Sequence, residues 1–172
     1  CYYPWYRNDL HTEEAPGNPQ LYLRRQLHPP QFRPMGEYDD RKKTVIGKHL
    51  KWSRRFNIDL WVLSWWGEDK REDLTIKNHI LVHNQLKNHQ IAIHYETMGR
   101  IREKDGYDLR NVISDLKYLC QQYFYHPNYY NMAVNTEGNP DTNSRKRVPV
   151  LFVYLTRELN ELGLLSDVID RM

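Results

Sequence analysis

Four short apolar runs, each followed by a polar stretch and then by helical periodicity, limit this sequence to a few folds. The runs are continuous and rich in β-branched and aromatic residues, as is typical of strands buried on both faces of a parallel sheet. They cover residues 1–5, 58–65, 90–95 and 148–155. The order βαβαβαβα predicts an α/β fold with right-handed crossovers, either a doubly wound sheet or a (β/α)8 TIM barrel.

The predicted helices carry recognisable start signals. Aspartates are expected to begin three of them, Asp39 or Asp40 the first, Asp73 the second and Asp108 the third. An aspartate side chain can accept hydrogen bonds from the free N–H groups of a first helical turn, which is why it marks such a start. The fourth helix is expected to start near Arg157.

Length favours a barrel of which only a part is present. A complete (β/α)8 barrel needs about 250 residues, and this chain has 172 residues and four βα units. No glycine-rich G-x-G-x-x-G turn follows a strand, which weighs against a dinucleotide-binding sheet. Because the chain opens at Cys1 inside an apolar run and stops at Met172 inside a helical pattern, we expect a single-domain fragment, the N-terminal half of a barrel.

The loops divide into a functional face and an opposite face. In both architectures ligands bind in the loops that follow the strands. Residues 6–38, 67–72 and 97–107 follow the first three strands and are therefore expected on the functional face. The segment before the fourth strand belongs to the opposite face, where residues 129–134 are expected to pair with residues 147–149 as a hairpin.

Charge and composition exclude several partner classes. Twenty-five Lys and Arg against 22 Asp and Glu give a net charge of +3, too even for a dedicated nucleic-acid-binding domain. No apolar run approaches the ~20 residues of a membrane span. Cys1 and Cys120 cannot build a cysteine zinc site, and His79 and His83 lack the glutamate of an H-E-x-x-H motif. We therefore expect no cofactor, no metal, no nucleic-acid partner and no membrane span.

Aromatic residues are the unusual component, with 13 Tyr and 5 Trp. Tyr3 and Tyr6 lie at the end of the first run, and Trp65 and Trp66 at the end of the second, so all four fall at the predicted functional face. Flat rings beside carboxylates suit a carbohydrate, because sugar C–H faces pack on the rings and carboxylates accept hydroxyl hydrogen bonds. A purely structural place in the core stays open for each tryptophan.

Strand alternation predicts where the carboxylate of the third run points. Residues 91, 93 and 95 are bulky and suit the helix layer, so His94 and Glu96 are expected to point into a barrel interior or cleft. A histidine and a glutamate are costly to bury unpaired, which favours a hydrogen-bonded site. A His–Glu pair that only satisfies itself is the alternative.

Five motifs follow one another along nearly the whole chain. They are Tyr2-Tyr3-Pro4-Trp5-Tyr6-Arg7-Asn8, Met35-Gly36-Glu37-Tyr38, Val62-Leu63-Ser64-Trp65-Trp66, Ile93-His94-Tyr95-Glu96 with Gly99-Arg100, and Val148-Pro149-Val150-Leu151-Phe152-Val153-Tyr154. In this order they resemble glycoside hydrolase family 99, the endo-α-1,2-mannosidase-like family. The resemblance implies a (β/α)8 barrel, of which this chain holds about the first four βα units, and retaining cleavage inside α-mannose-containing glycans. It also implies an oligosaccharide or glycan partner and a place in the secretory pathway or outside the cell.

The resemblance further implies roles for single residues. Tyr3 or Tyr6, and one of Trp65 and Trp66, match the aromatic substrate contacts of the family. Glu96 matches the carboxylate of the family's His-x-Glu strand, close to the reacting centre, and would act as an assisting carboxylate. Together with His94, these residues form the expected substrate-binding walls of a carbohydrate cleft.

The catalytic pair of the family is not expected in this chain. In family 99 the two working glutamates belong to a tryptophan-flanked Glu-x-x-Glu motif late in the barrel. Residues 158–161 have that spacing, but they lie at a helix start without a tryptophan, where an acidic turn complements the helix dipole. The chain alone is thus expected to be inactive. Two other functions stay open: a non-catalytic carbohydrate-binding or interaction domain on the same scaffold, and a glycosyltransferase-like relative.

Overall fold

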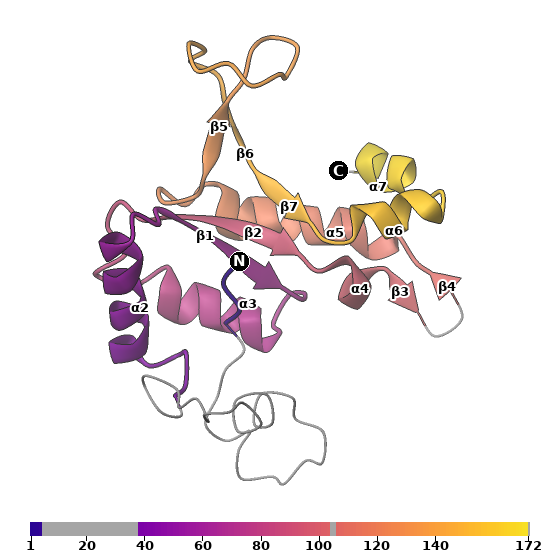
Figure 1. Cartoon of the computed structure of the whole chain (residues 1–172). Coiled ribbons are helices and arrows are strands. Elements are labelled where there is room, and N and C mark those ends of the chain that lie inside the picture. The colour runs from indigo at the N-terminus through magenta and orange to yellow at the C-terminus, as the bar shows by residue number, and fades with distance from the viewer. Residues whose placement is uncertain (5–37, 104–105, 172) are drawn as a thin grey trace, which may run out of the picture.

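A three-stranded parallel sheet forms the centre of the molecule (Figure 1). We describe the protein from a computed structural model, which places residues 1–4, 38–103 and 106–171. The strands are β1 (Leu60–Trp65), β2 (Gln90–Tyr95) and β7 (Leu151–Val153), in the order β1-β2-β7. The predicted α/β class with a parallel sheet is therefore confirmed.

Of the first predicted strand, the described residues 1–4 form a single parallel bridge, between Tyr2 and Leu63. The Tyr2 N–H donates to the Val62 carbonyl at 2.7 Å, and the Ser64 N–H donates to the Tyr2 carbonyl at 3.1 Å. Tyr2 thus extends the sheet beside β1, and the strand order follows the chain order from one edge to the other. A doubly wound sheet would instead reverse its order partway.

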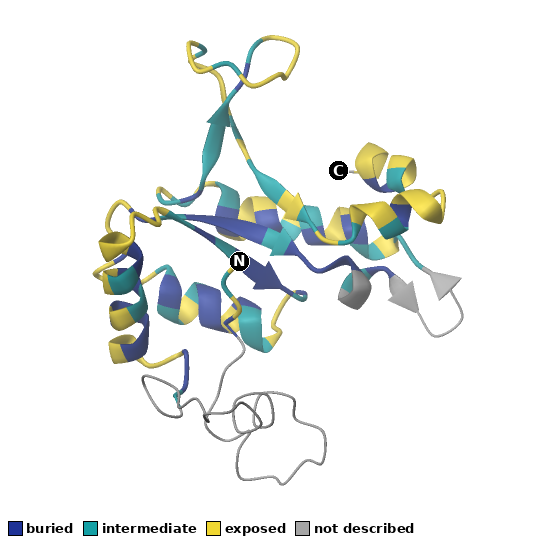
Figure 2. Ribbon diagram, in the orientation of Figure 1, coloured by how far each residue is buried: buried dark blue, intermediate teal, exposed yellow. Residues whose placement is uncertain are grey.

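The helices that follow the strands pack on one face of this sheet. They are α2 (Lys43–Arg55), α3 (Arg71–Thr75) continued by the π-helix η2 (Ile76–Ile80), and α5 (Arg110–Leu119) continued by the π-helix η3 (Cys120–Phe124). Their apolar side chains join one core with the sheet side chains that point the same way, and Figure 2 shows the burial concentrated in β1 and β2. The core comprises Ile46, Leu50, Trp61, Leu63, Trp65, Ile76, Ile80, Leu86, Ile91, Ile93, Tyr95, Leu119, Tyr123 and Tyr129. On the opposite face, β1 and β2 carry Leu60, Val62, Ser64, Gln90, Ala92 and His94.

The predicted aspartate caps are wrong in detail, because the structure uses these carboxylates elsewhere. The helix α2 starts at Lys43, after a Lys42 cap without a side-chain hydrogen bond, while Asp39 accepts from the Arg41 N–H at 2.9 Å. Asp73 lies inside α3 and not before it. Asp108 does accept from a first-turn N–H, at 2.8 Å, although the cap position itself is Leu109.

The fourth predicted strand is split in two. Its first part is β6 (Arg147–Pro149), which pairs antiparallel with β5 (Asn131–Ala133), and its second part is β7 on the central sheet. Pro149 has no N–H to continue a ladder, so the chain changes partner there. The expected hairpin is thereby confirmed, and Figure 1 shows it as an arm that projects from the sheet.

Short elements complete the chain at the ends of the last two strands. The helix α4 (Thr97–Arg100) and the small hairpin of β3 (Arg102–Glu103) and β4 (Gly106–Tyr107) follow β2. Two short helices, α6 (Thr156–Glu161) and α7 (Leu165–Arg171), stand where a single fourth helix was expected. Among the described residues, no helix has the length and hydropathy of a membrane span.

Gly67→Ala is expected to lower the free energy of unfolding by about 2 kcal/mol. Gly67 follows β1 with φ +126°, and a Cβ there would lie 2.9 Å from Nη1 of Arg100, a side chain held by Asp115 at 2.7 Å. Gly163→Ala is the matched control, because Gly163 has φ +70° but open space around it. Thermal melts compare the two, and equal losses would show that the contact with Arg100 does not matter.

Candidate functional site

Side chains from β1 and β2 meet where these strands end, on the sheet face opposite the helices α2, α3 and α5. The parallel register sets Ser64 beside His94, and His94 beside Phe152 of β7. Alternation brings Trp66 and Glu96 to the same face, one step beyond the strand ends. This is the edge at which parallel α/β folds bind their ligands.

The Ser64 hydroxyl connects two of these residues. It donates to Oε1 of Glu96 at 2.6 Å and accepts from Nε1 of the Trp66 indole at 3.0 Å. Ser64 is fully buried and Glu96 is 3% exposed, so the carboxylate is held in a fixed position with little water around it. Sequence reasoning did not single out Ser64, although its place two residues before Trp66 and opposite His94 gave a usable signal.

At this edge of the sheet His94 contributes a buried polar atom that the described residues leave without a hydrogen bond. Its Nδ1 is 3.3 Å from Oε1 of Glu96, but it is buried and makes no hydrogen bond with any residue that the structure describes. The imidazole and the Tyr154 ring form a T-shaped pair, with ring centroids 5.5 Å apart at 75°. Since a buried polar group normally has a partner, this nitrogen is suited to a ligand hydroxyl.

Exposed aromatic rings line the same face. Phe152 and Tyr154 are 38% and 40% exposed, which is unusual for rings that lie on or next to a sheet. The Tyr154 backbone is fixed by its N–H to the Tyr95 carbonyl at 3.1 Å and by its own carbonyl, which accepts from the Thr97 hydroxyl at 2.8 Å. Tyr154 was recognised only as part of a motif, and the structure adds its ring to the site.

The structure separates the two tryptophans that sequence analysis took together. Trp65 is fully buried on the helix side, where its Nε1 donates to Oδ1 of Asp73 at 2.9 Å, whereas Trp66 is on the open face. The position of Trp65 therefore argues against the predicted sugar contact. Tyr3 is 36% exposed and follows Tyr2, which places it on the face of Ser64, and Tyr6 lies outside the described residues.

The carboxylate of Asp73 explains why Trp65 turns inward. It is fully buried and accepts hydrogen bonds from donors on β1, the loop after β1, η2, α5 and η3. The donors are the Trp65 indole, the Asp69 N–H, the Lys77 ammonium and the hydroxyls of Tyr118 and Tyr123. Burial alone would raise the pKa of Asp73, but the hydrogen bonds outweigh it and hold that pKa below its usual range.

A second buried carboxylate, that of Asp115, lies on the helix side of the sheet. Asp115 accepts from the Tyr95 hydroxyl at 2.7 Å and from Nε and Nη2 of Arg100 at 2.8 and 2.7 Å. Burial and the hydrogen bond to Asp115 together raise the pKa of the Tyr95 hydroxyl. Both carboxylates serve packing between sheet and helices, so Glu96 is the carboxylate that the described strand ends present to the open face.

Neither a metal nor a catalytic carboxylate pair is assembled by the residues that the structure describes. No three of their histidine, cysteine, aspartate and glutamate side chains are grouped to hold a metal ion. Glu161 is the second glutamate of the Glu-x-x-Glu spacing at residues 158–161. It forms an exposed 3.6 Å ion pair with Arg157 along α6. What the site provides is aromatic surface, one carboxylate, one imidazole and one hydroxyl, a set suited to holding a sugar.

Comparison with known proteins gives a consistent family. The family model described as glycosyl hydrolase family 99 matches residues 25–160. A curated relative, glycoprotein endo-alpha-1,2-mannosidase of Mus musculus, is 27% identical over 121 residues, which are 70% of this chain and 24% of that protein. The chain thus spans about a quarter of the length of this relative.

Two solved structures share the fold. Both are GH99 endo-alpha-mannosidases of Bacteroides thetaiotaomicron, one of them in complex with BIS-TRIS-propane. They match with TM-scores of 0.56 and 0.53 at 19% and 21% identity, over 91% and 88% of this chain but only 41% and 43% of theirs. These structures are TIM barrels, and the present chain corresponds to part of one. Because the model of glycosyl hydrolase family 99 matches most of the length of this chain, the chain belongs to that family.

Proposed function

We propose that residues 1–172 are the N-terminal half of a (β/α)8 barrel, about its first four βα units, in a retaining endo-α-mannosidase-like glycoside hydrolase. The strand order follows the chain order, and the described helices α2, α3 and α5 cover the same face, as in a barrel wall. The share of the solved structures that the chain covers, 41% and 43%, agrees with this size. The open face of the sheet then becomes the interior of the barrel.

The role proposed for this part is to form the substrate-binding walls of a carbohydrate cleft. The observation that carries it is the chain of contacts Trp66–Ser64–Glu96 at the strand ends, with the unsatisfied Nδ1 of His94 beside it. Trp66, Tyr3 and Tyr154 would supply ring surfaces to a sugar. The printed activity of the mouse relative, endo-alpha-1,2-mannosidase, makes a glycan with internal α-mannose linkages the proposed substrate.

Cleavage of α-mannan oligosaccharides by the intact protein tests this proposal. We expect internal cleavage with retention of the anomeric configuration, followed by NMR of the first product formed. Retaining hydrolysis needs a second carboxyl close to the scissile bond, which the proposal assigns to other parts of the barrel. Binding without cleavage would instead favour a carbohydrate-binding domain, and transfer from an activated sugar would favour the glycosyltransferase-like alternative.

Trp66→Ala is expected to raise KM by about tenfold and to change kcat much less. A ring that stacks on a sugar does so in the ground state as well as in the transition state, so its loss mainly weakens binding. Steady-state kinetics on an α-mannan oligosaccharide measure both constants. Phe56→Ala removes an aromatic ring that is 68% exposed and remote from the cleft, and it should leave both unchanged. A fall in kcat alone would place Trp66 outside the binding surface.

A further inference from the structure

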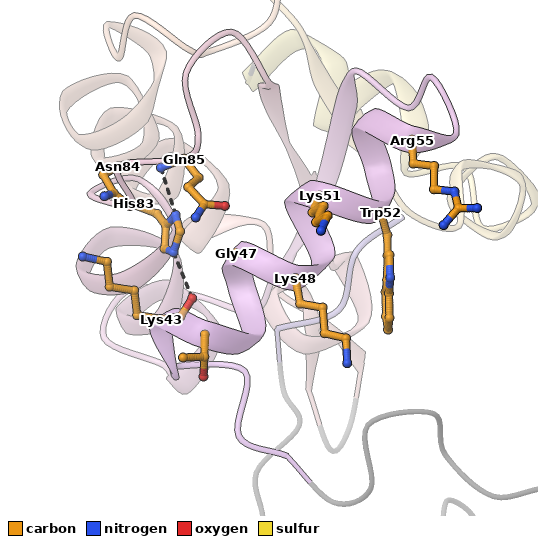
Figure 3. A pocket seen from close by; sticks show the side chains of 10 residues that line it. Lys43, Gly47, Lys48, Lys51, Trp52, Arg55, His83, Asn84 and Gln85 are labelled. Carbon is orange, nitrogen blue, oxygen red and sulfur yellow. Dashed lines mark hydrogen bonds between the residues drawn. The ribbon is translucent and has the colours of Figure 1, made fainter.

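A hollow lies between the helix α2 and the segment 83–85. Its volume is about 710 Å³, and it is separate from the strand ends described above. Figure 3 shows the side chains around it, with Lys48 and Trp52 extending from α2 on the same side. Its lining combines four cations, one tryptophan ring and two side-chain amides.

The hollow is built from segments that hold each other in place. His83 is buried, its Nε2 lies 2.9 Å from the Lys43 carbonyl, and its Nδ1 accepts the Gln85 N–H at 3.1 Å. Arg54 donates to the Gln85 carbonyl at 3.0 Å. Gly47 permits this close approach, because a Cβ there would lie 3.3 Å from Oε1 of Gln85. The arrangement of helix and segment is therefore fixed.

Positive charge is segregated on these two segments. Residues 41–58 and 75–95 contain no aspartate or glutamate, although the whole chain has 22 of them. The four cations that line the hollow, Lys43, Lys48, Lys51 and Arg55, form no ion pair with any residue in the described part of the chain. A cluster of unpaired cations around one hollow favours an anionic ligand.

The geometry points to a binding site for an anionic oligosaccharide, one that carries sulfate or carboxylate groups. Lys48 and Arg55 are about 10 Å apart along the helix axis, with Lys51 between them on the same face, so several anionic groups of one short glycan can be paired. The Trp52 ring, with Nζ of Lys48 5.2 Å from its centroid, offers surface to a sugar. Asn84 and Gln85 can donate to and accept from hydroxyls.

A glycan is chosen over other anions for two reasons. The amides and the indole match sugar hydroxyls and C–H faces, whereas a simple phosphate would need only the cations. The preference also rests on the proposed function, since a glycoside hydrolase meets polysaccharides. The site would bind an anionic oligosaccharide at a place separate from the proposed carbohydrate cleft at the strand ends.

Affinity electrophoresis of the intact protein in gels with dextran sulfate, polygalacturonate or neutral dextran tests the site. We expect both charged glycans to retard the protein and dextran not to. The triple variant Lys48→Gln, Lys51→Gln, Arg55→Gln should bind about tenfold more weakly. The control Arg145→Gln, Lys146→Gln, Arg147→Gln removes the same charge from the β5–β6 arm and should change binding less than about twofold. Trp52→Leu, which keeps all charges, should weaken binding about threefold.

Each other outcome overturns the inference. Equal losses in the two triple variants would mean that overall charge and not the hollow binds the glycan. No effect of Trp52→Leu, or tighter binding to polyglutamate or single-stranded RNA in the same gel, would mean that the ligand is another anion. Hydrolysis of a neutral α-mannan oligosaccharide, measured in parallel, reports separately on the proposed function, so that failure of one is distinguishable from failure of the other.

Discussion

Replacing Asp73 with asparagine is expected to lower the free energy of unfolding by about 3 kcal/mol. The carboxylate is fully buried and accepts from the Trp65 indole at 2.9 Å, the Tyr118 hydroxyl at 2.7 Å and the Lys77 ammonium at 2.9 Å. An amide of the same shape loses the negative charge and turns one acceptor into a donor. At least one buried donor and the charge of Lys77 are then left without a partner. Chemical denaturation at neutral pH measures the loss.

Asp69→Asn is the matched control for this substitution. Asp69 also lies near Lys77, at 3.5 Å, but its side chain is 75% exposed, and its φ of +58° is one that asparagine tolerates. We expect a change of less than about 0.5 kcal/mol. A similar loss in both variants would mean that general charge around Lys77, and not the buried hub, stabilises the fold.

Acid should remove the same stabilisation in the unaltered protein. The native pKa of Asp73 lies below its unfolded value of about 3.9. Unfolding therefore takes up a proton in the window between the two values, and stability present at neutral pH is lost as the pH falls from about 4 towards the native pKa. Asp73→Asn has no such proton to take up, so its stability should fall less steeply with acid over this window.

The elements of this fold were predictable where the local signal and the tertiary contacts agree. The second and third apolar runs became β1 and β2, because each has bulky apolar residues on its helix-facing side and pairs with a strand of the same kind. The fourth run did not remain one strand, because Pro149 ends one ladder and the next residues join another sheet. The strand with which a segment pairs depends on residues distant in the sequence, so an apolar run alone does not predict it.

The candidate site was predictable through alternation and not through residue type. His94 and Glu96 were expected on one face from their spacing, and the structure has them there with Ser64 between Glu96 and Trp66. Residue type alone made Trp65 and Trp66 equivalent, although a buried acceptor on α3 draws Trp65 into the core. The same aspartate was expected to be a helix cap, because the sequence does not show that the hydroxyls of Tyr118 and Tyr123, distant along the chain, donate to it. Contacts of that kind decide between core and cleft.

Glu96→Gln is expected to reduce turnover of the intact protein by about two to three orders of magnitude while keeping the fold. A charged acceptor beside a developing positive centre contributes a few kcal/mol to the transition state, and each 1.4 kcal/mol is about tenfold in rate. In the unaltered protein the Ser64 hydroxyl lies 2.6 Å from Oε1 of Glu96. Glutamine has the same shape as glutamate, and its carbonyl oxygen can still accept this hydrogen bond. The Trp66–Ser64 contact on the other side should therefore survive.

The competing interpretation gives the opposite result, which makes the substitution decisive. Glu96 is only 3% exposed and lies 3.3 Å from Nδ1 of His94, so it could act as half of a buried pair that stabilises the sheet end. Its change would then lower the melting temperature and leave turnover per folded molecule nearly the same. Ser64→Ala separates the two further, because it frees the Glu96 carboxylate without removing its charge. If Glu96 acts on the sugar, Ser64→Ala should lower kcat by a smaller factor than Glu96→Gln, since the charge is present but no longer held in place.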